Sequence, residues 1–144
     1  MKQLIVLLIS LTVFTTACAT TGSVFTLSVG DCFNDPDDPD GITHDTSVQI
    51  VDCETPHDNQ VYALFAIAGE SFPGQTVVQQ EASVGCSDNF APYVGAEYSG
   101  SMLDISFLAP SKESWDRSDG REVVCVLYDR NGALLTGSVE GTGV

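Results

Sequence analysis

The chain has 144 residues, which allows one domain, and 43% of them are apolar, which is enough to build a core. Twenty acidic residues against five basic ones give a net charge of −15, and no lysine or arginine lies between Lys2 and Lys112. This charge excludes nucleic acid as a partner and opposes contact with anionic lipid headgroups, because both need basic side chains. A cationic partner or a divalent metal stays open, as does an acidic surface that serves only solubility.

The first residues have the layout of a secretory signal. Lys2 is followed by an apolar stretch at 4–14, which is too short for a bilayer span of roughly 20 residues. The small residues at 15–17 lead into Cys18, and this pattern resembles a bacterial lipobox, although Thr15 replaces the usual aliphatic residue. We predict a signal peptide over 1–17 and a palmitate-bearing lipid anchor on Cys18. The open alternative is an ordinary secretory signal.

The number of cysteines favours the lipid anchor. Five cysteines are an odd set for an exported protein, and removing Cys18 leaves four, which allow three disulfide pairings. We favour Cys32–Cys53, which closes an acidic loop, and Cys86–Cys125, which joins a helix to a late strand. A Cys53–Cys86 bond would contradict this pairing.

The first segments after the anchor are short and polar. Residues 18–25 are rich in Thr, Ser and Gly and are predicted to form a flexible tether, so that the domain proper covers 26–144. Alternation at 26–29 predicts the start of a strand. Residues 34–45 contain two prolines and a glycine and predict a loop.

The acidic loop carries a candidate calcium site. Its carboxylates precede Gly41 at nearly alternating positions, as the hard oxygen ligands of Ca²⁺ do, but Pro39 breaks the EF-hand spacing. A solvated acidic loop is therefore the main prediction, and a weak Ca²⁺ site is the alternative. The candidate ligands are Asp35, Asp37, Asp38 and Asp40.

The remaining segments predict an α+β domain. Residues 75–93 predict a helix, because apolar side chains recur every fourth position from Val78 to Phe90. Asn131-Gly132 is a hairpin signal, after which the chain is expected to pair back. One main helix should therefore pack on a face of an antiparallel sheet, with two disulfides. The predicted strands are residues 47–53, 60–68, 102–108, 122–128 and 133–139.

These motifs resemble the septum formation domain of actinobacterial envelope proteins over about residues 29–141. The motifs that carry the resemblance are Val29-Gly30-Asp31-Cys32-Phe33, Val51 to His57, Val61-Tyr62-Ala63, Cys86, Phe90 to Gly95, Tyr98, Leu108-Ala109-Pro110, Trp115, Arg121, Val124-Cys125 and Leu135 to Ser138. Gln60 departs from the family pattern, which usually has an acid there. The resemblance implies an envelope protein linked to septum formation or cell division, and it implies no defined reaction.

Two classes of function remain open from the sequence. The first is a non-catalytic binding or scaffolding lipoprotein on the extracytoplasmic face of the cell membrane, with an envelope-protein or cell-wall partner and no evident small-molecule substrate. The second is a hydrolase-like enzyme that uses His57, although no Gly-x-Ser-x-Gly elbow is present. A Ca²⁺-binding adhesion module is a minor third. We expect no catalytic residues and no cofactor other than weak Ca²⁺.

Structural roles are predicted for the signature residues. Pro56 should fix the turn after the Cys53 strand, and His57 should tie that turn to neighbouring backbone. A zinc site at His57 would lack thiolate ligands once the cysteines are oxidised. The cation of Arg121 is expected to stack on Trp115 or to pair with an acid such as Asp52 or Asp104.

Overall fold

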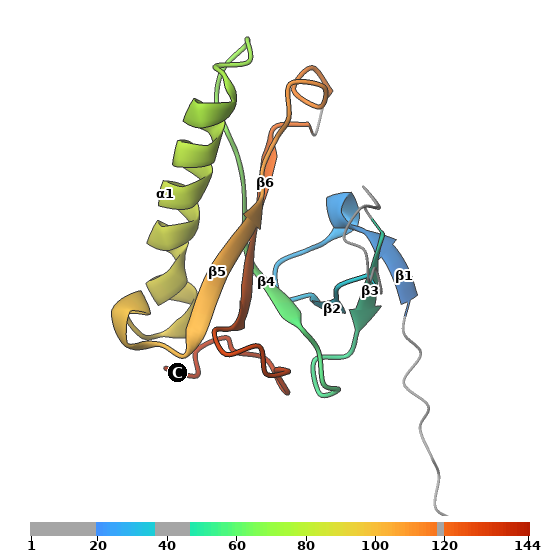
Figure 1. The fold of residues 1–144 in the computed structure, drawn as a ribbon, viewed down its shortest axis with the longest axis vertical. Helices are drawn as coiled ribbons and strands as arrows, with labels where there is room; N and C mark the ends of the chain where they lie inside the picture. Colours follow the sequence, from blue (N-terminus) through green and yellow to red (C-terminus); the bar gives the residue numbers. More distant parts are fainter. Residues whose placement is uncertain (1–19, 37–46, 118–119) are drawn as a thin grey trace, which may run out of the picture.

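The computed structural model describes residues 20–36, 47–117 and 120–144. In this part of the chain, one long helix lies against one face of a six-stranded antiparallel sheet, which confirms the predicted α+β architecture (Figure 1). The strand order is β1-β3-β2-β4-β6-β5. The elements are β1 (Thr20–Ser23), β2 (Cys32–Asn34), β3 (Ser47–Val51), β4 (Asn59–Ala66), α1 (Gln75–Val94), β5 (Leu103–Leu108) and β6 (Glu122–Asp129).

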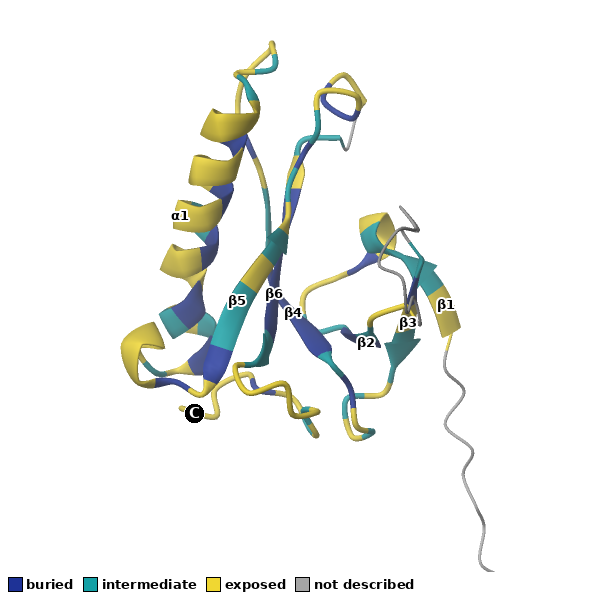
Figure 2. Ribbon diagram, in the orientation of Figure 1, coloured by how far each residue is buried: buried dark blue, intermediate teal, exposed yellow. Residues whose placement is uncertain are grey.

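The helix forms where its apolar spacing predicts it. Every fourth residue of one stripe is buried and faces the sheet, while the opposite side of α1 is exposed (Figure 2). Gly95 ends the helix in the left-handed conformation, with φ of 84°, and its N–H donates to the Ala91 carbonyl at 2.9 Å. The buried stripe consists of Val78, Ala82, Cys86, Phe90 and Val94.

The sheet separates two apolar clusters. The larger cluster lies between α1 and the sheet, and it includes Phe90, Leu127 and the nearly inaccessible Trp115. The smaller cluster lies on the other face, which we call the open face, and it contains Phe33 and Val126. Both faces are apolar because alternate residues of β6 point to opposite sides.

A β-bulge in β4 keeps the apolar side chains of both halves of the strand on the correct faces of the sheet. The pairing of β4 with β6 shifts between Val61 and Ala63, so Tyr62 is an extra residue. Val61 belongs to the open-face cluster, whereas Tyr62 and Ala63 both belong to the cluster under α1. Without the extra residue, one half of β4 would present its side chains to the wrong face.

Two disulfides hold the sheet and the helix, and both have the predicted pairing. Cys86, from the buried stripe of α1, bonds to Cys125 in β6, with Cα atoms 5.5 Å apart. Cys32 at the start of β2 bonds to Cys53 after β3, with Cα atoms 5.2 Å apart. In the loop-entropy account, these crosslinks contribute roughly 4 and 3 kcal/mol to stability.

The predicted final hairpin is wrong. The turn forms, since the Gly132 N–H donates to the Asp129 carbonyl at 3.0 Å, but no strand follows over 133–139. The reason is topological: β6 already has β4 on one side and β5 on the other. The chain instead makes an isolated bridge between Leu135 and His57.

The segment before β2 also differs from the prediction. Residues 20–23 of the expected tether form β1, which pairs with β3. Residues 24–26 form a 3-10 helix, where the Ser23 side chain accepts from Phe25 N–H, so that no strand starts at Thr26. A polar edge strand such as β1 carries little hydrophobic signal in the sequence. In the described ranges, no helix has the length and apolarity needed to cross a bilayer.

One glycine of α1 sets a close approach between helix and sheet. The ring of Phe65, in β4, lies against Gly85, where a Cβ atom would overlap it. Gly85 therefore admits an aromatic side chain to a place that any larger residue would occupy.

Candidate functional site

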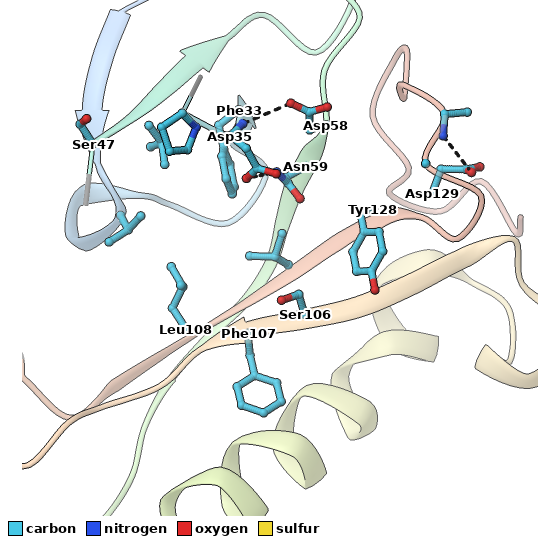
Figure 3. A pocket seen from close by; sticks show the side chains of 16 residues that line it. Phe33, Asp35, Ser47, Asp58, Asn59, Ser106, Phe107, Leu108, Tyr128 and Asp129 are labelled. Atoms are coloured by element: carbon cyan, nitrogen blue, oxygen red, sulfur yellow. Dashed lines mark hydrogen bonds between the residues drawn. The ribbon is translucent and has the colours of Figure 1, made fainter. Parts of the chain in front are cut away.

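The open face contains a cavity of about 470 Å³ between the β2–β3 part of the sheet and the β5–β6 part. Its apolar lining includes Phe33, Leu108 and Val126, and polar lining comes from Ser106 and Tyr128 (Figure 3). Phe107 points the other way, toward α1. An apolar wall with a few polar groups is typical of a binding cavity.

Carboxylates at the cavity supply its charge. Asp35, Asp58 and Asp129 line it, and no lysine, arginine or histidine is among the described lining residues. The Asn59 side chain donates to Asp35 at 2.8 Å, and the Asp35 backbone N–H donates to the Asp58 carboxylate at 3.2 Å (Figure 3). The end of β2 and the start of β4 thus hold two carboxylates side by side.

The electrostatics of this pair favour a cation. Burial raises the pKa of the Asp35 carboxyl above its ordinary value, and the charge of Asp58 raises it further, while the Asn59 hydrogen bond acts in the opposite direction. Asp35 as a whole residue is exposed. Its raised pKa therefore reflects the partial burial of the carboxylate group alone. A cation in the cavity would relieve both unfavourable effects.

The third carboxylate is partly committed to the local fold. Asp129 accepts from the backbone N–H of Asn131 at 2.8 Å and of Ala133 at 3.3 Å. It therefore orders the turn after β6 as well as bordering the cavity.

His57 lies apart from this cavity and is fully buried. Its Nδ1 is 2.8 Å from the Thr55 carbonyl, which can only accept, so Nδ1 carries the proton. Its backbone exchanges hydrogen bonds with Leu135 at 3.0 and 2.8 Å. The Nε2 atom has no hydrogen-bond partner among the described residues. These contacts tie the His57 corner to the backbone of Thr55 and of Leu135.

Trp115 and Arg121 occupy the other end of β4. The guanidinium of Arg121 lies 5.4 Å from the Trp115 ring centroid, as predicted. It donates to the carbonyls of Trp115 and Gly69 and forms no ion pair with an acid among the described residues. Asp104 pairs with Arg130 instead, at 3.7 Å. The signature residues are therefore at opposite ends of one strand and form no common site.

Other predicted positions fall partly outside the described residues. Cys18 and the carboxylates at 37, 38 and 40 lie in the ranges that the structure does not describe. Asp35 is the one calcium candidate that it places. Within residues 20–36, 47–117 and 120–144, no group of three or more His, Cys, Asp or Glu is arranged to hold a metal ion.

The buried network around Gln60 has a clear structural role. Gln60 is inaccessible, and its amide donates to Ser138 Oγ at 2.9 Å, while its carbonyl accepts from Val139 N–H at 2.8 Å. It also donates to the Tyr93 hydroxyl and the Gly30 carbonyl. The amide's ability to donate and accept thus joins β4, α1 and the last segment of the chain.

Sequence reasoning missed most of the cavity. Asp58 and Tyr128 belong to no motif, and seven separate stretches of the chain bring the lining together. One signal was present: side chains of a strand point to alternate faces, which places Val124, Val126 and Tyr128 on one face of β6.

Comparison with known proteins identifies a family and two relatives. The septum formation family model matches residues 20–142. The chain is 36% identical over 124 residues to LppN, a candidate lipoprotein of Mycobacterium tuberculosis, and equally to LppN of Mycobacterium bovis. The matched region covers 83% of this chain and 66% of each relative, so the chain spans just under two thirds of their length. No solved structure matches. The chain belongs to the septum formation family.

Proposed function

We propose that this chain is an exported, lipid-anchored envelope protein that binds an extracytoplasmic partner through its open-face cavity, without catalysis, in septum formation. The family membership and the lipoprotein name of the mycobacterial relatives support the envelope setting. The apolar stretch before Cys18 supports export and an anchor on the extracytoplasmic face of the membrane.

The observation that carries the binding role is the composition of the cavity. It combines an apolar wall with Asp35, Asp58 and Asp129 and lacks a described basic residue. A lysine side chain, with an apolar stem and a cationic head, has the matching chemistry. The partner would therefore present such a side chain, or a similar amine, to the cavity.

His57 gives the hydrolase alternative little support. A catalytic base must reach the proton that it removes, and a fully buried ring that is held by the Thr55 carbonyl has no such access. A His57→Ala variant tests this point. We expect lost or weakened folding; a variant that folds normally but no longer complements a deletion strain would favour a functional site.

Membrane fractionation tests the anchor. Cys18→Ala should move the protein from the membrane fraction to the medium, because a lipid chain would no longer hold it. Unchanged fractionation would contradict the anchor, whatever the cavity does.

A matched pair of small probes tests the cavity. Nα-acetyl-lysine methylamide, which keeps its side-chain ammonium group, should shift the NMR signals of Asp58, Asn59 and Tyr128. Nα-acetyl-norleucine methylamide, which lacks only that ammonium group, should not. Asp58→Asn should weaken the lysine effect. Asp88→Asn removes the same charge from an exposed position on α1 and should leave it unchanged. Equal effects of both probes, or none, would contradict a cation site.

The calcium alternative remains a separate prediction. A Ca²⁺ titration that raises the melting temperature at millimolar concentration would support a site that includes Asp35. No change in melting temperature would leave the acidic loop as a solvated surface.

A further inference from the structure

The side of β4 that faces away from β6 is only partly paired. On this side, β2 pairs with Asn59 and Gln60 only, and Val61 exchanges hydrogen bonds with Asp31 and Gly30. From Tyr62 to Ala66, β4 has no neighbouring strand here among the described residues. Among the residues that the structure describes, half of this central strand is therefore a free sheet edge.

The pairing with β6 fixes which backbone groups this edge presents. Ile67 N–H donates to the Arg121 carbonyl at 3.0 Å across the ladder. Residues of an antiparallel strand alternate between facing the partner and facing away. Leu64 and Ala66 therefore direct their N–H and C=O groups away from β6, toward the free side.

An apolar groove of about 470 Å³ runs beside this edge, between the end of β4 and α1. Phe65 and Ile67 line it from the sheet side, and Val77 and Val84 line it from the helix. These two valines are 40% and 55% exposed, so part of an apolar helix face is left uncovered.

Apart from the bulge at Tyr62, the usual protection of an exposed edge is missing here. Natural sheets block free edges with lysine, proline or a bulge. The stretch from Ala63 to Ala66 has no charged residue and no proline, and the bulge lies before it, at Tyr62. An open edge with four available backbone groups next to an apolar groove has the geometry for adding a strand.

We propose that an extended segment of a basic envelope protein docks here as an added strand along β4, with alternate apolar side chains in the groove beside α1. Glu81 lines the groove and no lysine or arginine is among its lining residues, so a lysine beside Glu81 meets a complementary charge. A second copy of this chain is the wrong occupant, because two molecules of charge −15 repel each other.

Amide hydrogen exchange followed by NMR tests the edge directly. In the free protein, the Leu64 and Ala66 amides should exchange faster than those of Phe65 and Ile67, which face β6. A panel of short peptides, with valine alternating with threonine between lysine-rich ends, is then added. We expect at least one to slow exchange at Leu64 and Ala66 by about tenfold or more, because their N–H groups become paired.

Three controls separate strand addition from non-specific binding. Peptides N-methylated at alternate amides keep their side chains but should not protect Leu64 or Ala66. Val84→Lys should weaken binding about tenfold or more, since it places a cation in the groove, and Met102→Lys should not. Met102 is 61% exposed and lies outside the groove lining.

Three outcomes would overturn the proposal. They are failure of every peptide in the panel to protect the two amides at millimolar concentration, equal protection by the N-methylated peptides, and a dimer of the free protein that buries this edge. Because the cavity residues lie on the open face, the lysine-probe experiment can succeed or fail independently of these results.

Discussion

On the α1 side of the sheet, alternate residues of β4, β5 and β6 meet a helix; on the open face, residues of the same strands meet short strands and loops. The first arrangement is held by a disulfide, by Trp115 and by five buried helix residues, and its groove lies only at the end of β4. The second leaves a cavity of about 470 Å³ with carboxylates at its border. One sheet therefore combines a face that is covered by the helix with a face that retains a cavity, and each can be perturbed separately.

The largest expected effect distinguishes the two disulfides. Replacing Cys86 and Cys125 together with alanine should lower the free energy of unfolding by roughly 4 kcal/mol, because it removes the longer crosslink. Replacing Cys32 and Cys53 should cost roughly 3 kcal/mol. Urea unfolding of the unchanged protein and of the two double variants measures both losses of unfolding free energy. A larger loss from the second pair would mean that the open-face half of the sheet limits stability.

The next effect concerns the buried network that joins β4 to the end of the chain. Gln60→Leu leaves the Val139 N–H without its acceptor, so we expect a loss of about 1–3 kcal/mol. Gln60→Glu keeps an acceptor for that N–H but loses the donor to the Gly30 carbonyl and buries a carboxyl group, so it should also destabilise. Urea unfolding is the measurement, and Gln79→Leu, at an exposed position of α1, is the control. Equal stability of Gln60→Leu and the control would contradict the role of this network.

The smallest effect tests the open face. Asp58→Asn removes the charge that helps to raise the Asp35 pKa but keeps an oxygen for the Asp35 N–H, so that pKa should fall toward its ordinary value. A raised carboxyl pKa gives stability at low pH that is lost as pH rises through the folded-state pKa. The variant should therefore lose less stability on going from acid to neutral pH. The difference should be about a few tenths of a kcal/mol, because Asp35 is exposed and solvent screens its charge.

An NMR titration of the Asp35 carboxyl carbon measures this shift. Asp88→Asn, the same charge change on α1, should leave the titration unchanged. An Asp35 pKa that does not fall in Asp58→Asn would mean that the two carboxylates do not interact.

The sequence predicted the α1 side better than the open face. Spacing of four identified the helix and placed Cys86 on its buried side, which is why the Cys86–Cys125 bond could be anticipated. The final hairpin failed because Asn131-Gly132 specifies a turn but cannot show that both sides of β6 are occupied. Local patterns report local geometry, whereas strand order depends on the whole chain.

Local sequence patterns could not predict the open-face cavity, for the same reason. Asp35 and Asp58 are far apart in the chain and come together because β2 pairs with the start of β4. The short length of β2 and the polar composition of β1 give almost no periodic signal. The carboxylates were visible in the sequence, but their common surroundings were not.

The contact between Gly85 and Phe65 has a consequence for reading variation in this family. Alanine would favour an exposed helix position by about 1 kcal/mol over glycine, yet here its methyl group would push the aromatic ring into the neighbouring groove. A saturation mutagenesis screen would therefore report at position 85 how far the Phe65 ring can move, although the residue there has no chemistry of its own. Among relatives, the size of the residue at this one place would act as a marker of groove shape.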